Sequence, residues 1–149
     1  MLETATTPLI ILNKIAKLDI ISGSFDAVLV APEVANELKT LNVEGLVVKA
    51  VEDSGLVRAL ASQMDLREAA TVALAYETPN SVAVLDDRKG RRVAREMGLS
   101  VVGTLGTVVR AKELGIIEEA APIFSLIQKA GLFVSPSLVQ EALRRAGES

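Results

Sequence analysis

The sequence contains neither cysteine nor histidine among its 149 residues. The absence of cysteine excludes disulfides, thiolate metal sites and thiol nucleophiles. The absence of histidine excludes Ser-His-Asp triads, imidazole general bases and histidine metal ligands. Any catalytic chemistry must therefore use carboxylates, hydroxyls, lysine, arginine, the one tyrosine or a bound hard metal ion.

Aromatic residues and long apolar runs are also scarce. Aromatic residues make up 3% of the chain and tryptophan is absent, so base stacking cannot dominate nucleic-acid recognition. No apolar run approaches the roughly 18 residues of a membrane-spanning helix, and no signal peptide is recognisable. We therefore expect a cytoplasmic protein with no membrane association. The formal net charge of −3 gives no general attraction to nucleic acid, so such binding requires a local basic patch.

Half of the residues are apolar, which excludes a disordered chain, and the length fits a single domain over residues 1–149. Short β-branched bursts alternate with longer helical patterns, which is typical of an α/β protein with a mostly parallel sheet. Continuous apolar bursts suit strands buried on both faces. We expect strands at residues 2–5, 26–30, 46–51, 81–85 and 100–102.

Capping residues, prolines and glycines mark the expected helices. These helices cover residues 7–18, 32–41, 54–62, 66–76, 88–97, 104–114, 118–130 and 136–146. The sequence G-T-L-G at residues 103–106 lacks the lysine and glycine spacing of a phosphate loop. We interpret it as a closely packed strand-to-helix turn.

Two acidic residues, Asp86 and Asp87, directly follow the expected strand 81–85. In open α/β sheets, ligands bind outside the carboxyl ends of the strands, so either side chain can face a binding crevice. The alternative for Asp87 is a helix cap, because aspartate is a strong N-cap residue. The alternative for Asp86 is a solvated turn residue.

Two further acids lie on helices. Glu68 is near the start of a helix that is apolar on nearly every face and is therefore expected to be buried. It can also complete a capping box with Asp65, and the two roles are compatible. Glu37 lies at the edge of the apolar stripe of the helix 32–41, although a long side chain at such a boundary can reach water.

Carboxylates gathered without histidine or cysteine form a site of hard oxygen ligands, which suits Mg²⁺ or Mn²⁺. Such an ion can lower the pKa of an attacking water and neutralise charge at a phosphodiester. A bound divalent cation also relieves the repulsion between the acids. The acidic residues therefore favour phosphodiester chemistry with a divalent metal.

One dense basic stretch stands out in an otherwise acidic chain, beginning one residue after the acids. Helical spacing places Arg88, Arg92 and Arg95 on one face. Guanidinium groups match phosphate oxygens with paired, planar donors. We therefore expect nucleic acid to bind here, with an ordinary solvated helix face as the alternative. The candidate residues are Arg88, Lys89, Arg91, Arg92 and Arg95.

Taken together, these residues resemble the PIN-domain family, and specifically its VapC-like toxin ribonuclease branch. The likeness covers nearly the whole chain, through A-G-L-F-V-S near the C-terminal end. It implies a three-layer α/β/α fold and a Mg²⁺- or Mn²⁺-dependent endoribonuclease. It also implies an RNA substrate, an antitoxin partner and a homodimer. The matching segments are T-T-P-L-I (6–10), P-E-V-A-N-E-L (32–38), R-E-A-A-T-V-A-L-A (67–75), V-L-D-D-R-K-G-R-R-V-A (84–94) and G-T-L-G (103–106).

The resemblance implies catalytic and metal-binding roles for several residues and reveals one departure. The implied residues are Glu37, Glu68 and the pair Asp86 and Asp87, together with the hydroxyl of Thr7. Where the family has an acid two residues before that hydroxyl, this chain has Ala5, whose methyl group cannot bind a cation. Losing one of about four carboxylates predicts weak or absent nuclease activity.

Two other interpretations stay open. A non-catalytic module would bind RNA or a protein through residues 88–95 and would keep the acids as remnants. It would bind RNA in a salt-sensitive manner without metal-dependent cleavage. A receiver-like phosphoacceptor, with Asp86 or Asp87 near the acceptor position, is disfavoured because no lysine stands at the end of a later strand.

Overall fold

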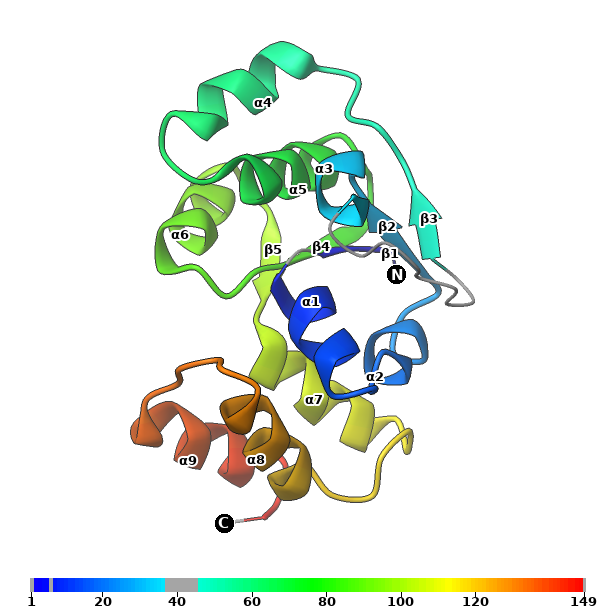
Figure 1. Cartoon of the computed structure of the whole chain (residues 1–149), viewed down its shortest axis with the longest axis vertical. Coiled ribbons are helices and arrows are strands. Elements are labelled where there is room, and N and C mark those ends of the chain that lie inside the picture. Colours follow the sequence, from blue (N-terminus) through cyan, green and yellow to red (C-terminus); the bar gives the residue numbers. More distant parts are fainter. Residues whose placement is uncertain (1, 6, 37–45, 149) are drawn as a thin grey trace.

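A computed structural model describes residues 2–5, 7–36 and 46–148 (Figure 1). Its strands form one sheet in the order β3-β2-β1-β4-β5, with every described pair parallel. The predicted α/β fold with a parallel sheet is confirmed. The strands are β1 (Leu2–Ala5), β2 (Ala27–Val30), β3 (Leu46–Val48), β4 (Ser81–Val84) and β5 (Ser100–Val102).

Helices lie on both sides of this sheet and complete three layers. In Figure 1, α4, α5 and α6 lie on one side of the sheet, and α1, α2, α7, α8 and α9 lie on the other. The described helices are α1 (Thr7–Lys14), α2 (Asp19–Ser22), α3 (Pro32–Ala35), α4 (Ser54–Ala61), α5 (Leu66–Tyr76), α6 (Arg88–Glu96), α7 (Thr104–Glu113), α8 (Ala121–Lys129) and α9 (Pro136–Arg145). No helix in these ranges is long and apolar enough to cross a membrane.

Alternating side chains of the central strands feed two separate cores. In β2, Val28 and Val30 pack with α1, α2, α7, α8 and α9, whereas Leu29 packs with α4, α5 and α6. In β4, Val84 joins the first core and Ala83 the second. This alternation follows from the two-residue period of a strand. Both faces are apolar, which explains why these strands appear as continuous apolar bursts in the sequence.

Helix α5 packs directly against the middle of the sheet. Every residue from Ala69 to Ala75 is buried, as the small apolar sequence predicts. Alanine-rich helices can approach a sheet closely because they carry little side-chain bulk. The helix contacts both β1 and β4, and Glu68 lies in its first turn.

Several helix boundaries differ from the sequence prediction. Helix α1 ends at Lys14 rather than at residue 18, because Ala16 adopts a left-handed φ of 56° and a second short helix follows. Nothing in the sequence marks that turn, since glycine is the usual residue there. Helix α8 begins at Ala121 rather than at residue 118. The structure describes α3 only over Pro32–Ala35, so the remainder of the predicted helix 32–41 lies outside the described residues.

The strand order creates a switch point at the centre of the sheet. Strand β1 pairs with β2 on one side and with β4 on the other. The connections that leave these strands run to helices on opposite faces (Figure 1). Ligands of doubly wound sheets bind outside the carboxyl ends of the strands at such a point. The acids after β4 stand there.

Candidate functional site

The register of the sheet brings the carboxyl ends of three strands to the same level. Ala5, the last residue of β1, pairs with Val84 of β4, and Val84 pairs in turn with Val102 of β5. Asp86 follows Val84 by two residues, and Thr104 follows Val102 by the same interval. The acids therefore emerge beside the strand that ends at Ala5. We call this region the acidic edge, comprising Glu68, Asp86 and Asp87.

Asp86 is held by the start of the neighbouring helix. Its Oδ1 accepts a hydrogen bond of 2.9 Å from the backbone N–H of Thr104, and its Oδ2 accepts one from the Thr104 hydroxyl. Thr104 is fully buried, so this contact fixes the orientation of the carboxylate. Asp86 is thus a positioned side chain rather than a freely solvated turn residue.

Asp87 begins α6, as its capping alternative predicts. Its Oδ2 accepts a 2.8 Å hydrogen bond from the backbone N–H of Gly90. A methyl group on Gly90 would lie 3.6 Å from this oxygen and 3.6 Å from Oε2 of Glu68. One carboxylate oxygen of each residue therefore lies near the backbone of Gly90. Capping leaves Oδ1 of Asp87 available, so the cap role and a ligand role are compatible.

Glu68 is the buried carboxyl group of the acidic edge. Burial raises its pKa to about 7, and the negative charges of Asp65, Asp87 and Asp86 act in the same direction against a weaker opposing effect of Arg67. Asp65 caps α5 by accepting a 2.9 Å hydrogen bond from the Glu68 N–H. A cation at this edge would favour the charged form of Glu68, because it would offset both burial and repulsion.

The donor set fits a hard divalent cation in kind, since all three candidate side chains are carboxylates. Within residues 2–5, 7–36 and 46–148, however, no group of three acids lies close enough together to hold a metal ion. Glu37, the remaining predicted ligand, lies outside the described residues. Thr7 is the first residue of α1, directly beyond the end of β1. Its position suits the acidic edge, and its proposed role stays a prediction.

Arg91 reaches from α6 toward Asp86 across the backbone of Gly103. A methyl group on Gly103 would lie 2.9 Å from Oδ1 of Asp86 and 3.0 Å from Nη1 of Arg91. Only glycine leaves room for both groups at this turn. The pKa of Arg91 lies below its usual value because of burial and the nearby charge of Arg95, while Asp86 acts in the opposite direction.

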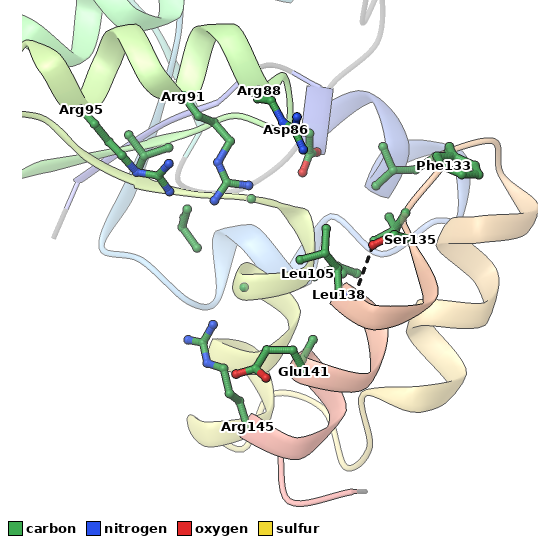
Figure 2. Close-up of a pocket in the computed structure, with 17 residues that line it drawn as sticks. Asp86, Arg88, Arg91, Arg95, Leu105, Phe133, Ser135, Leu138, Glu141 and Arg145 are labelled. Atoms are coloured by element: carbon green, nitrogen blue, oxygen red, sulfur yellow. Dashed lines mark hydrogen bonds between the residues drawn. The ribbon is translucent and has the colours of Figure 1, made fainter.

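A groove of about 590 Å³ opens beside the acidic edge (Figure 2). Asp86 lines it, together with residues of α6, the β5–α7 turn, the 132–135 segment and α9. Arg88, Arg91 and Arg95 line it from α6, in contrast to the predicted face of Arg88, Arg92 and Arg95. Spacings of three and four place Arg91 between its two neighbours on that face. Lys89 and Arg92 are exposed and lie outside the lining.

Sequence reasoning missed three residues of this region: Thr104, Phe133 and Arg145. Thr104 meets Asp86 across 18 positions of the chain, and no local pattern signals such a contact. Arg145 lies near Glu141 and Glu148 in the sequence, a pattern typical of ordinary surface charge. Phe133 lies between Leu132 and Val134 in a short apolar run, and its exposure becomes evident only in three dimensions.

The fold and the edge define a doubly wound parallel α/β protein with carboxylates gathered at its central strands. A family profile described as a PIN domain matches residues 4–148, and the chain belongs to the PIN-domain family. This membership supports a nuclease role. No curated protein and no solved structure gave a match to the chain.

Proposed function

We propose that this protein is a Mg²⁺- or Mn²⁺-dependent endoribonuclease of the VapC-like kind, the toxin of a toxin–antitoxin pair, weakened by alanine at position 5. The observation that supports it best is the acidic edge beside the end of β1. There Glu68 is buried near Asp87, and the charges of Asp87 and Asp86 both act on it. Membership of the PIN-domain family supplies the nuclease class.

Different residues of the chain would bind the cation, orient its ligands and bind the RNA phosphates. Glu68, Asp86 and Asp87, with Glu37, would hold the cation, and Thr104 would keep Asp86 oriented toward it. When bound, the cation would lower the pKa of an attacking water and neutralise charge at the phosphodiester. Arg91 and Arg95 would bind the phosphates that flank the scissile bond, because guanidinium groups pair with phosphate oxygens.

A second candidate is a non-catalytic module that binds RNA or a protein. Two observations favour it. Ala5 removes a ligand at the central strand, and the described part of the chain contains no group of three acids placed for a metal ion. A module of this kind would retain salt-sensitive RNA binding.

The deciding experiment compares the chain with Ala5→Asp and Ala5→Asn in cleavage of a mixed RNA substrate with Mn²⁺. We expect Ala5→Asp to cut and EDTA to stop it. We expect Ala5→Asn to remain as weak as the parent, because an amide matches the shape of aspartate without its charge. Adding Glu68→Gln to Ala5→Asp should abolish the gain. If Ala5→Asp does not cut, the second candidate replaces the first.

The proposal extends to partners. An antitoxin would insert a basic side chain into the acidic edge, where negative charges raise the pKa of Glu68. A homodimer is proposed from the same resemblance to VapC-like toxins. Co-purification with a neighbouring small protein tests the first, and sedimentation velocity tests the second. A monomer that purifies alone would contradict both.

A further inference from the structure

The groove beside the acidic edge has exposed apolar side chains, which a metal site does not require. Phe133 is 92% exposed at its rim, and Leu138 on α9 is 58% exposed nearby. Exposing a whole aromatic ring to water forgoes the free energy that burying it would supply. In Figure 2, Asp86 lies between the arginines of α6 and Phe133.

The charge of the groove is positive. Four arginines line it, against two acids, Asp86 and Glu141. Asp86 is already bound by Thr104, and Glu141 forms an ion pair with Arg144, which is outside the lining. Among the described residues, no ion pair engages any of the four lining arginines, which are Arg88, Arg91, Arg95 and Arg145.

The arginines come from two walls. Figure 2 shows Arg91 and Arg95 directed into the groove from α6, and Arg145 directed toward it from α9. Cations from both sides converge on one space, and this arrangement suits a chain of phosphates better than a single anion. The exposed ring at the rim supplies an apolar flat surface next to that cationic track.

We propose that this groove holds one strand of RNA, which crosses the acidic edge at Asp86. Arg91, Arg95 and Arg145 would contact its phosphates, and Phe133 would stack on one base. The proposal rests on the proposed ribonuclease function and deepens it by naming a path for the substrate.

A single strand fits this groove better than a duplex. Its volume of about 590 Å³ lies within the range of sites that enclose a single small molecule. Bases in a duplex are stacked on each other, whereas those of a single strand offer a free face to an aromatic side chain. The combination of a cationic track with an exposed ring is typical of single-strand recognition.

The test measures binding without cleavage. Fluorescence anisotropy in EDTA follows a fluorescein-labelled single-stranded RNA and the matching duplex, at several salt concentrations. Phe133→Leu should weaken single-strand binding by about tenfold, because stacking on one base is lost. Phe133→Tyr should retain it. Both changes affect an exposed side chain, and thermal melting verifies that each variant folds.

Arg145→Gln is compared with Arg58→Gln, which removes one exposed positive charge from α4, away from the groove. Arg145→Gln should weaken binding and reduce the salt slope by about one, whereas Arg58→Gln should leave both unchanged.

The groove proposal is overturned if Phe133→Leu and Arg145→Gln bind as tightly as Arg58→Gln. It is equally overturned if the parent binds no single-stranded RNA at low salt, or prefers the duplex. Failure of the nuclease proposal looks different. In that case the groove variants weaken binding as expected, while Ala5→Asp never cuts the bound strand.

Discussion

At the scale of single residues, the unusual feature is a carboxyl group that the fold makes hard to ionise. Glu68 is buried among other acids, and its pKa rises to about 7. Proteins accept such a cost at functional sites more often than elsewhere. A cation bound at the acidic edge, as proposed, would therefore change the protonation of Glu68.

Glu68 predicts a pH dependence of stability in the absence of divalent cations. Its pKa is about 7 in the folded state against 4.5 in the unfolded chain, so the folded state binds more protons between these values. The contribution of Glu68 to the free energy of unfolding should therefore be greatest below pH 4.5 and should fall by roughly 2–3 kcal/mol as the pH rises to neutrality. Urea denaturation in EDTA at several pH values measures this change in the free energy of unfolding.

The control for this prediction is Glu68→Gln, which should flatten the profile over the same pH range. Parent and variant profiles that run parallel would show that Glu68 does not titrate in this way. Millimolar Mn²⁺ should stabilise the parent at pH 7.5 more than the variant, because a charged Glu68 is a cation ligand and glutamine is a weaker one.

The hydrogen bond from the Thr104 hydroxyl to Asp86 predicts that Thr104 positions this carboxylate. Thr104→Val keeps the shape of this buried residue and removes the hydroxyl that donates to Asp86. In the Ala5→Asp background we expect RNA cleavage to fall by roughly 10–100-fold, the usual effect of removing a group that orients a metal ligand. Thr104→Ser retains a hydroxyl and should cut nearly as well. Equal rates for Val and Ser would rule out this role.

At the scale of elements, Asp87 both caps α6 and is one of the proposed metal ligands. It caps the helix through the N–H of Gly90, and Oε2 of Glu68 lies near the same glycine. Asparagine caps a helix about as well as aspartate, whereas alanine does not. Substitutions at Asp87 therefore distinguish the two roles.

We expect Asp87→Asn to leave thermal stability nearly unchanged and Asp87→Ala to cost about 1 kcal/mol. Both should reduce cleavage in the Ala5→Asp background, because neither supplies a negative charge to the cation. Melting curves and cleavage rates on the same preparations measure the two effects. Full activity in Asp87→Asn would leave Asp87 with only its capping role.

The elements also show what a single sequence can predict. Helices α5 and α6 begin where Asp65 and Asp87 predict, because their capping chemistry is local. Gly98 and Gly115 adopt the positive φ expected beyond α6 and α7. The end of α1 was missed because Ala16 adopts that conformation without being glycine. Caps and terminal glycines can be recognised in the sequence, whereas a turn imposed by the tertiary structure cannot.

The same division applies to the candidate site. The acids at Asp86 and Asp87 could be predicted because they follow a recognisable strand. The groove could not, because it joins α6 to α9 across some fifty residues that no periodicity connects. The contact between Thr104 and Asp86 likewise depends on the pairing of β4 with β5.

At the scale of the whole molecule, the carboxylate of Glu148 holds the segment after α9 against two other helices. Glu148 accepts hydrogen bonds from the Lys112 ammonium at 2.8 Å and from the N–H groups of Ala120 and Ala121 at 2.8 and 3.0 Å. These contacts lower its pKa to about 2. They tie the segment after α9, the helix that carries Arg145, to α7 and to the start of α8.

Glu148→Gln should therefore destabilise the protein by roughly 1–2 kcal/mol at pH 7, because hydrogen bonds to a charged acceptor are lost. The pKa is depressed, so the stabilisation is complete above about pH 4.5 and disappears as pH falls toward 2. Denaturation of parent and variant at pH 7 and pH 3 measures this. The difference in stability between the two proteins should be smaller at pH 3 than at pH 7; an equal difference at both pH values would contradict the assignment.

The central position of β1 has a consequence for biosynthesis. Strand β1 has one neighbour in residues 27–29, but its other neighbour, residues 81–84, is synthesised much later. Asp86 can be held in place only after Thr104 has been made, and α9 with Arg145 follows later in the chain. Partial chains would therefore lack both the finished acidic edge and the groove. In this order of assembly, the proposed action on RNA would begin only once α9 has been made and has packed against α7.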